Sequence, residues 1–109
     1  MPSARDILAG MPDRFDAEAA QGLNVVVQFH LGGEGGGTHH VVVRDGDIRV
    51  AAGAHHKPTM SLTLEGTDFV ALAEGELSPQ LAFMNRRVQI AGDVGMASKL
   101  LAILGVGRS

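Results

Sequence analysis

The sequence predicts an α+β domain in which helices cover one face of a mostly antiparallel, five-stranded sheet. Some segments place apolar residues at helical spacing, whereas others alternate apolar and polar residues with a period of two. An Asp-Gly pair at residues 45–46 joins two of the alternating segments, which is typical of a tight antiparallel hairpin. The predicted order is α-β-β-β-β-α-α-β-α, and such grouping of strands and helices indicates the α+β class.

The first predicted helix covers residues 4–20. Ser3 is its expected N-cap, and Pro12 is expected to kink or split it. Its apolar positions share helical spacing: Ile7, Leu8, Met11 and Phe15.

Three strands are expected next, over residues 23–31, residues 40–44 and a short segment that begins at Ile48. A glycine-rich loop, residues 32–37, precedes the second strand. Pairing Arg44 with Asp47 across the Asp-Gly turn fixes the register of the hairpin. It places two further pairs on one face: Val43 with Ile48, and Val41 with Val50.

The fourth strand is predicted over residues 59–65, with Met60, Leu62 and Leu64 facing inward. Two short helices follow. Thr67 is expected to cap the first, residues 68–74, before Gly75 ends it; Ser78 and Pro79 are expected to open the second, which runs to about Arg86. A fifth strand over residues 88–91 and a last helix from Asp93 to Leu104 complete the prediction.

Length and composition favour one domain over residues 1–109. Hydrophobic residues make up 45% of the chain, yet the only aromatic residues are four phenylalanines. The net charge of −3 and the scattered lysines and arginines argue against a nucleic-acid partner. No apolar run reaches the roughly 18 residues of a membrane span, and the N-terminus lacks the pattern of a signal peptide, so we expect a cytoplasmic protein.

The last helix carries more apolar surface than one core-facing stripe requires. One stripe contains Val94, Ala97, Leu101 and Leu104, and the adjacent one contains Met96, Leu100 and Ile103. A second layer of the same protein, a partner chain or a bound apolar ligand would cover the surplus. An apolar cavity of the kind that binds small molecules would be lined by Phe69, Leu72, Phe83, Met84, Met96 and Leu100.

Histidines raise a metal hypothesis, because His39-His40 and His55-His56 form pairs and a seven-residue loop would bring His30 opposite His40. No carboxylate is clearly placed to complete such a site, so no metal is expected. The serines lie in no Gly-x-Ser-x-Gly context, no His-Glu-x-x-His occurs, and the glycine loop lacks the Gly-Lys-Ser/Thr ending of a phosphate loop. We therefore expect neither catalysis nor a cofactor.

An ordered series of motifs resembles the sterol carrier protein 2 domain. The series "PTMSLTLEGTDFVALAEGELSPQLAFMNRRVQIAGDVGMASKL" carries most of it, and "MPDRFDAEAAQGLNVVVQF" and "RDGDIRV" extend the similarity over nearly the whole chain. The resemblance implies helices over an apolar tunnel that binds sterols, fatty acids, fatty acyl-CoA or phospholipids, without catalysis. It places the ligand-binding residues at Phe69, Leu72, Gln80, Phe83, Met84, Ile90, Met96, Leu100 and Leu104.

The sequence departs from the family pattern at Asn85-Arg86-Arg87, where a Gly-Lys pair is common. The tripeptide Ser98-Lys99-Leu100 is internal, so a peroxisomal location is not indicated. Leu101, Leu104 and Val106 are expected to rim a tunnel mouth, which a second subunit would cover in a homodimer. The alternative function is an interaction or dimerisation module without a ligand of its own.

Overall fold

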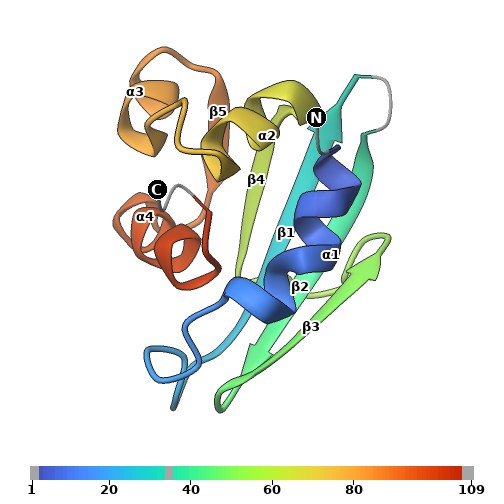
Figure 1. Cartoon of the computed structure of the whole chain (residues 1–109), viewed down its shortest axis with the longest axis vertical. Helices are drawn as coiled ribbons and strands as arrows, with labels where there is room; N and C mark the ends of the chain where they lie inside the picture. Colours follow the sequence, from blue (N-terminus) through green and yellow to red (C-terminus); the bar gives the residue numbers. More distant parts are fainter. Residues whose placement is uncertain (1–2, 34–35, 107–109) are drawn as a thin grey trace.

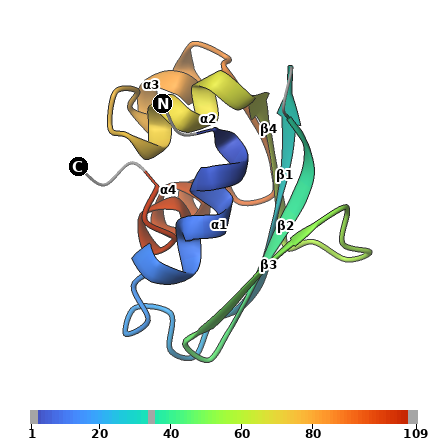
Figure 2. The same cartoon turned by 45° about the vertical axis from the view of Figure 1, so that its right-hand side comes forward.

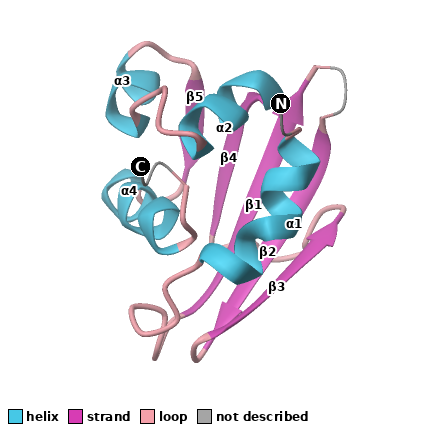
Figure 3. Ribbon diagram, viewed as in Figure 1, coloured by secondary structure: helices cyan, strands magenta, loops and turns pink. Residues whose placement is uncertain are grey.

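Four helices lie together on one face of a five-stranded sheet in the computed structural model, which describes residues 3–33 and 36–106 (Figures 1, 2 and 3). The helices are α1 (Ala4–Arg14), α2 (Gly66–Ala73), α3 (Pro79–Met84) and α4 (Val94–Ile103). The strands are β1 (Asn24–Gly32), β2 (Gly37–Arg44), β3 (Asp47–Ala52), β4 (Met60–Glu65) and β5 (Val88–Ala91). The predicted α+β class and strand number are confirmed.

The strand order is β3-β2-β1-β4-β5, so the first strand of the chain lies at the centre of the sheet. Three neighbouring pairs are antiparallel, as expected, but β1 and β4 run parallel. The parallel pair requires a crossover, because β3 ends at the sheet edge and β4 begins beside β1. Figure 2 shows the β3–β4 connection on the face of the sheet turned away from the helices, which we call the outer face.

The predicted register of the β2–β3 hairpin is confirmed. Arg44 pairs with Asp47, and the pairs of Val43 with Ile48 and Val41 with Val50 follow. Asp45 and Gly46 occupy the turn with φ values of 47° and 84°. Two consecutive positive φ values match the twist of the adjoining strands, which explains why this dipeptide closes the hairpin.

The predicted pairing of His30 with His40 is wrong. His30 lies opposite Thr38, and His40 lies opposite Gln28, because the β1–β2 connection is two residues shorter than expected. The slip is an even number of residues, so every side chain remains on its predicted face. Part of that connection, residues 34–35, lies outside the described residues.

The first helix is shorter than predicted and ends at Arg14. Ser3 forms the predicted cap and accepts from the Asp6 amide, while the Asp6 side chain accepts from the Ser3 amide. Pro12 lies in the last turn and lacks the amide hydrogen that would continue the hydrogen-bond ladder. The chain leaves the helix at Phe15, whose ψ is 151°, so Pro12 precedes the helix end instead of kinking a longer helix.

The remaining helix ends differ from prediction by a few residues. The expected Thr67 cap is wrong, because α2 begins at Gly66 directly after β4 and its N-cap, Glu65, makes no side-chain cap hydrogen bond. Ser78 and Pro79 open α3 as predicted, but that helix ends at Met84. Arg86 follows it with a φ of 60°, a left-handed conformation that costs a non-glycine residue free energy.

The core lies between the inner face of the sheet and the helices. Phe29 of β1 packs against Phe69 of α2, with ring centroids 5.2 Å apart. Val27 and Val41 are fully buried beside them. On the outer face, Gln28 is only 7% exposed, because the β3–β4 connection covers it and the His55 amide donates to its side-chain oxygen at 2.8 Å. None of the described helices is long and apolar enough to cross a membrane.

Candidate functional site

A small apolar pocket lies where α3, α4 and β5 meet beside the end of α2. Its volume is about 80 Å³. It is lined by Leu72, Pro79, Gln80, Phe83, Val88, Ile90, Ala97 and Leu101. The Gln80 amide is the one strongly polar side chain among these eight, and none of them carries a charge. This composition, mostly apolar with an isolated polar group, is characteristic of small-molecule sites.

The structure brings four of the nine predicted ligand-binding residues to this pocket: Leu72, Gln80, Phe83 and Ile90. The other five lie elsewhere. Phe69, Leu100 and Leu104 are at most 2% exposed and belong to the core cluster, so they support the pocket wall instead of lining it. Met84 and Met96 are 74% and 39% exposed and lie at the surface.

Four lining residues were absent from the predicted set: Pro79, Val88, Ala97 and Leu101. Sequence patterns could have identified three of these four residues. Val88 begins the predicted fifth strand, and Ala97 and Leu101 share one stripe of the last helix. The choice between the two stripes depends on how α4 is rotated against the sheet. The side chain of Val94, predicted on the same stripe, lies outside the described part of the chain.

Both ends of α4 are fixed by local hydrogen bonds, and this sets the position of Ala97 and Leu101. The Asp93 carboxylate accepts from the amides of Gly95 and Met96, which confirms the predicted start of the helix. At the other end, the Val106 amide donates to the Leu101 carbonyl, around Gly105 with a φ of 82°. A helix held at both ends presents a defined wall to the pocket.

A wider surface hollow adjoins the pocket. Its volume is about 490 Å³, and it is lined by Phe83, Met84, Arg86, Val88, Gln89 and Ile90. The pocket and the hollow share Phe83, Val88 and Ile90. Phe83 is 41% exposed although it lines the pocket, and on the same helix Leu81 is 55% exposed. The surface of α3 around the hollow is therefore unusually apolar.

One ion pair fixes the segment between α3 and β5 to α2. The Arg87 guanidinium lies 3.4 Å from the Asp68 carboxylate, whose side chain is largely buried. The pair joins α2, one wall of the pocket, to the residue that precedes β5. It helps to fix the spacing of these elements without placing a charge inside the pocket.

The histidines do not assemble a metal centre. Within residues 3–33 and 36–106, no group of three or more histidine, cysteine, aspartate or glutamate side chains is placed to hold a metal ion. His55 instead stacks on His56 with ring centroids 4.6 Å apart and meets the His40 ring edge-on. The His40 Nδ1 lies 2.8 Å from the Gly53 carbonyl, to which it donates. These contacts hold the β3–β4 connection on the outer face.

The comparison with protein families agrees with this architecture. The model of the SCP-2 sterol transfer family matches residues 5–105. The chain belongs to this family. Hydroxysteroid dehydrogenase-like protein 2 of Xenopus tropicalis is 33% identical over 89 residues, which cover 81% of this chain and 21% of that protein. The chain thus spans about a fifth of the length of the first curated relatives it matches.

Solved structures of the SCP-2 type share the fold. The apo form of sterol carrier protein 2 from Yarrowia lipolytica superposes with a TM-score of 0.75 at 23% identity, covering 97% of this chain and 93% of that one. Palmitated SCP2L2 from Aedes aegypti also gives a TM-score of 0.75, at 19% identity, covering 99% of both chains. The sheet and helices described above are therefore the SCP-2 architecture.

Proposed function

We propose that the chain binds one lipid-like molecule in the pocket between α3, α4 and β5 and performs no chemistry on it. The observation that carries the proposal is the uncharged, largely apolar lining, in which the Gln80 amide is the one strongly polar group. Membership of the SCP-2 sterol transfer family and the palmitate held by the Aedes aegypti relative support a ligand with an acyl chain.

The driving force in this proposal is desolvation. Each methylene transferred from water to the pocket contributes about 0.8 kcal/mol, so an alkyl chain provides affinity in proportion to its buried length. The Gln80 side chain offers two donor hydrogens and one acceptor oxygen, which suit a carboxyl or hydroxyl head group. The other lining groups exclude water from the chain.

The pocket must expand to admit such a ligand. Its volume of about 80 Å³ is smaller than the several hundred Å³ of ordinary ligand sites, whereas the adjoining hollow has about 490 Å³. Phe83 borders both spaces, so rotation of its ring joins them into one channel. In this proposal α3 is the movable wall and its exposed apolar residues surround the entrance. Phe83 is then the gate residue.

A chain-length series tests the proposal. Saturated fatty acids of increasing length displace a fluorescent fatty acid from the purified protein, and affinity is expected to rise with each methylene until the channel is full. Replacing Phe83 with alanine should preserve binding and speed ligand exchange. A response that is flat across chain lengths contradicts the proposal.

The alternative, an interaction module without a ligand, is less favoured because it assigns no role to the internal pocket. Native mass spectrometry separates the two readings. A carrier is expected to retain co-purified lipid as a bound mass, whereas a dimerisation module is expected to appear as a ligand-free dimer.

A further inference from the structure

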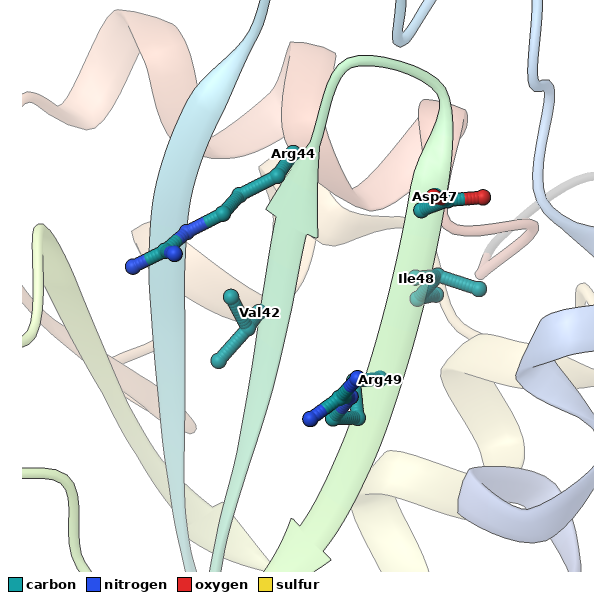
Figure 4. Close-up of a pocket in the computed structure, with 5 residues that line it drawn as sticks. All are labelled: Val42, Arg44, Asp47, Ile48 and Arg49. Carbon is teal, nitrogen blue, oxygen red and sulfur yellow. The ribbon is translucent and has the colours of Figure 1, made fainter.

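A second hollow lies on the outer face of the sheet, away from the lipid pocket. It has a volume of about 420 Å³ and is formed by the β2–β3 hairpin. Figure 4 shows the five residues that line it: Val42, Arg44, Asp47, Ile48 and Arg49.

The two arginines approach the hollow from neighbouring strands. Arg49 pairs with Val42 across the hairpin, and Arg44 lies two residues beyond Val42 on the same face. In Figure 4 the Arg44 side chain reaches across β1, and the Arg49 guanidinium lies on the same side of the hairpin. The Asp47 carboxylate lies on the same face, because Asp47 is the cross-strand partner of Arg44 and also lines the hollow, although in Figure 4 it points away from Arg44. Two guanidinium groups therefore flank the Val42 side chain, and with one carboxylate among the lining residues the hollow carries a net charge of +1.

Among residues 3–33 and 36–106, neither guanidinium lies within ion-pair distance of a carboxylate. In the part of the chain that the structure describes, the ion pair found is that of Arg87 with Asp68, and both Arg44 and Arg49 are exposed. Lys57, in the β3–β4 connection, is a further exposed cation on this side. Asp45 occupies the hairpin turn beside Arg44, and Glu65 lies at the opposite end of the sheet against Gly32. The residues that line the hollow thus carry two positive charges and one negative charge, although the chain has a net charge of −3.

We propose that Arg44 and Arg49 form a binding site for a phosphate group. Guanidinium groups bind tetrahedral oxyanions through paired hydrogen bonds, and two of them on adjacent strands offer up to ten N–H donors to one phosphate. The hollow is open, so the phosphate can belong either to a soluble phosphate monoester or to a lipid head group. The site lies across the sheet from the lipid pocket and does not depend on that pocket binding lipid.

The neighbouring His55 provides a spectroscopic reporter. Partial burial is the main cause that holds the pKa of His55 below its ordinary value. The nearby His56, His40 and Arg44 lower it further. The Lys57 amide donates to His55 Nδ1 at 3.0 Å, which holds the ring in place. A dianion bound at Arg44 offsets the positive field of that side chain, so it is expected to raise the pKa of His55.

Binding is measured by NMR titration with inorganic phosphate at pH 7 and constant ionic strength. We expect saturable shifts at Arg44 and Arg49 and at His55, and a loss of affinity of about tenfold or more in the double variant R44Q/R49Q. The matched control, R5Q/K99Q, removes two exposed charges from the helical layer and is expected to bind phosphate as the unsubstituted protein does. The His55 pKa is followed separately with sulfate, whose charge is constant between pH 5 and 8.

Two further ligands identify the source of the phosphate. Glycerol 3-phosphate in solution and phosphatidylcholine vesicles containing phosphatidic acid are compared, and preferential binding of either one supports the site and names its source. The proposal is overturned if phosphate shifts are unsaturable, or if R44Q/R49Q and R5Q/K99Q weaken binding equally. Circular dichroism of both variants verifies that they are folded, and exposed glutamines are compatible with the strands they occupy.

Discussion

Replacing Ala97 with leucine is the sharpest test of the lipid pocket. Ala97 lines the pocket and is only 1% exposed, so a larger side chain at this position has little space available except the pocket. The same substitution at Ala102, which is exposed on the same helix, adds the same three carbons outside the pocket. The pair A97L and A102L therefore separates pocket occupation from any general effect of leucine on α4.

The volume of the pocket sets the expected changes of A97L in the free energy of unfolding and in ligand affinity. Filling an 80 Å³ cavity offers at most about 2 kcal/mol of stability, at roughly 24 cal/mol per Å³. Strain from overpacking costs roughly 1–3 kcal/mol, so the free energy of unfolding of A97L should remain within about 1 kcal/mol of the wild-type value. The added carbons displace roughly three ligand methylenes at about 0.8 kcal/mol each, which corresponds to a loss of affinity of roughly 60-fold.

Urea unfolding and displacement of a fluorescent fatty acid are the two assays. A97L is expected to unfold near the wild-type midpoint but to bind the probe weakly, and A102L should match the wild type in both measurements. Wild-type affinity in a folded A97L protein would refute the assignment of this pocket as the ligand site. Equal losses of affinity in A97L and A102L would refute it as well.

Three other predictions test the fold. Arg86→Gly relieves a left-handed backbone and should raise the free energy of unfolding by about 1 kcal/mol, whereas Arg87→Gly should lower it; chemical denaturation compares the two. Gln28→Ala removes the acceptor of the His55 amide and should cost about 1–3 kcal/mol, with faster exchange of that amide; unchanged exchange would contradict the hydrogen bond. Burial and a nearby arginine lower the pKa of His39 in the folded protein. The unfolded chain therefore binds a proton on His39 more readily, and the free energy of unfolding should fall as the pH drops through about 6.5. His39→Asn should flatten this pH dependence, and an unchanged pH profile would exclude His39 as its source.

The turn and register of the β2–β3 hairpin could be predicted because their determinants are local, although β2 begins three residues before the predicted start at His40. The turn dipeptide selects the loop, and Val41 and Val43 must face the same side as Ile48 and Val50. The β1–β2 register was not determined in this way, since the glycine-rich connection tolerates several lengths. Alternation limited the error to an even number of residues, which preserved the face of each side chain but changed the partner of His30.

The pocket was located only in part, because its lining depends on tertiary placement. Apolar patterns within single helices or strands were enough to predict three lining residues, Leu72, Phe83 and Ile90. The last helix is apolar on two adjacent stripes, so the sequence does not determine whether Leu100 or Leu101 meets the pocket. In the structure, the placement of α4 relative to β5 puts Leu101 at the pocket and Leu100 in the core.

The parallel pairing of β1 with β4 has a consequence for folding kinetics. The β2–β3 hairpin closes a turn of two residues, whereas Val27 of β1 lies 33 positions before Met60, its partner in β4. Long-range contacts of this kind are slow, because the closure entropy must be overcome before they are formed. Every residue that lines the pocket lies after β4 in the chain, between residues 72 and 101. The ability to bind a ligand is therefore expected to be recovered in the late phase of refolding, after the hairpin has formed.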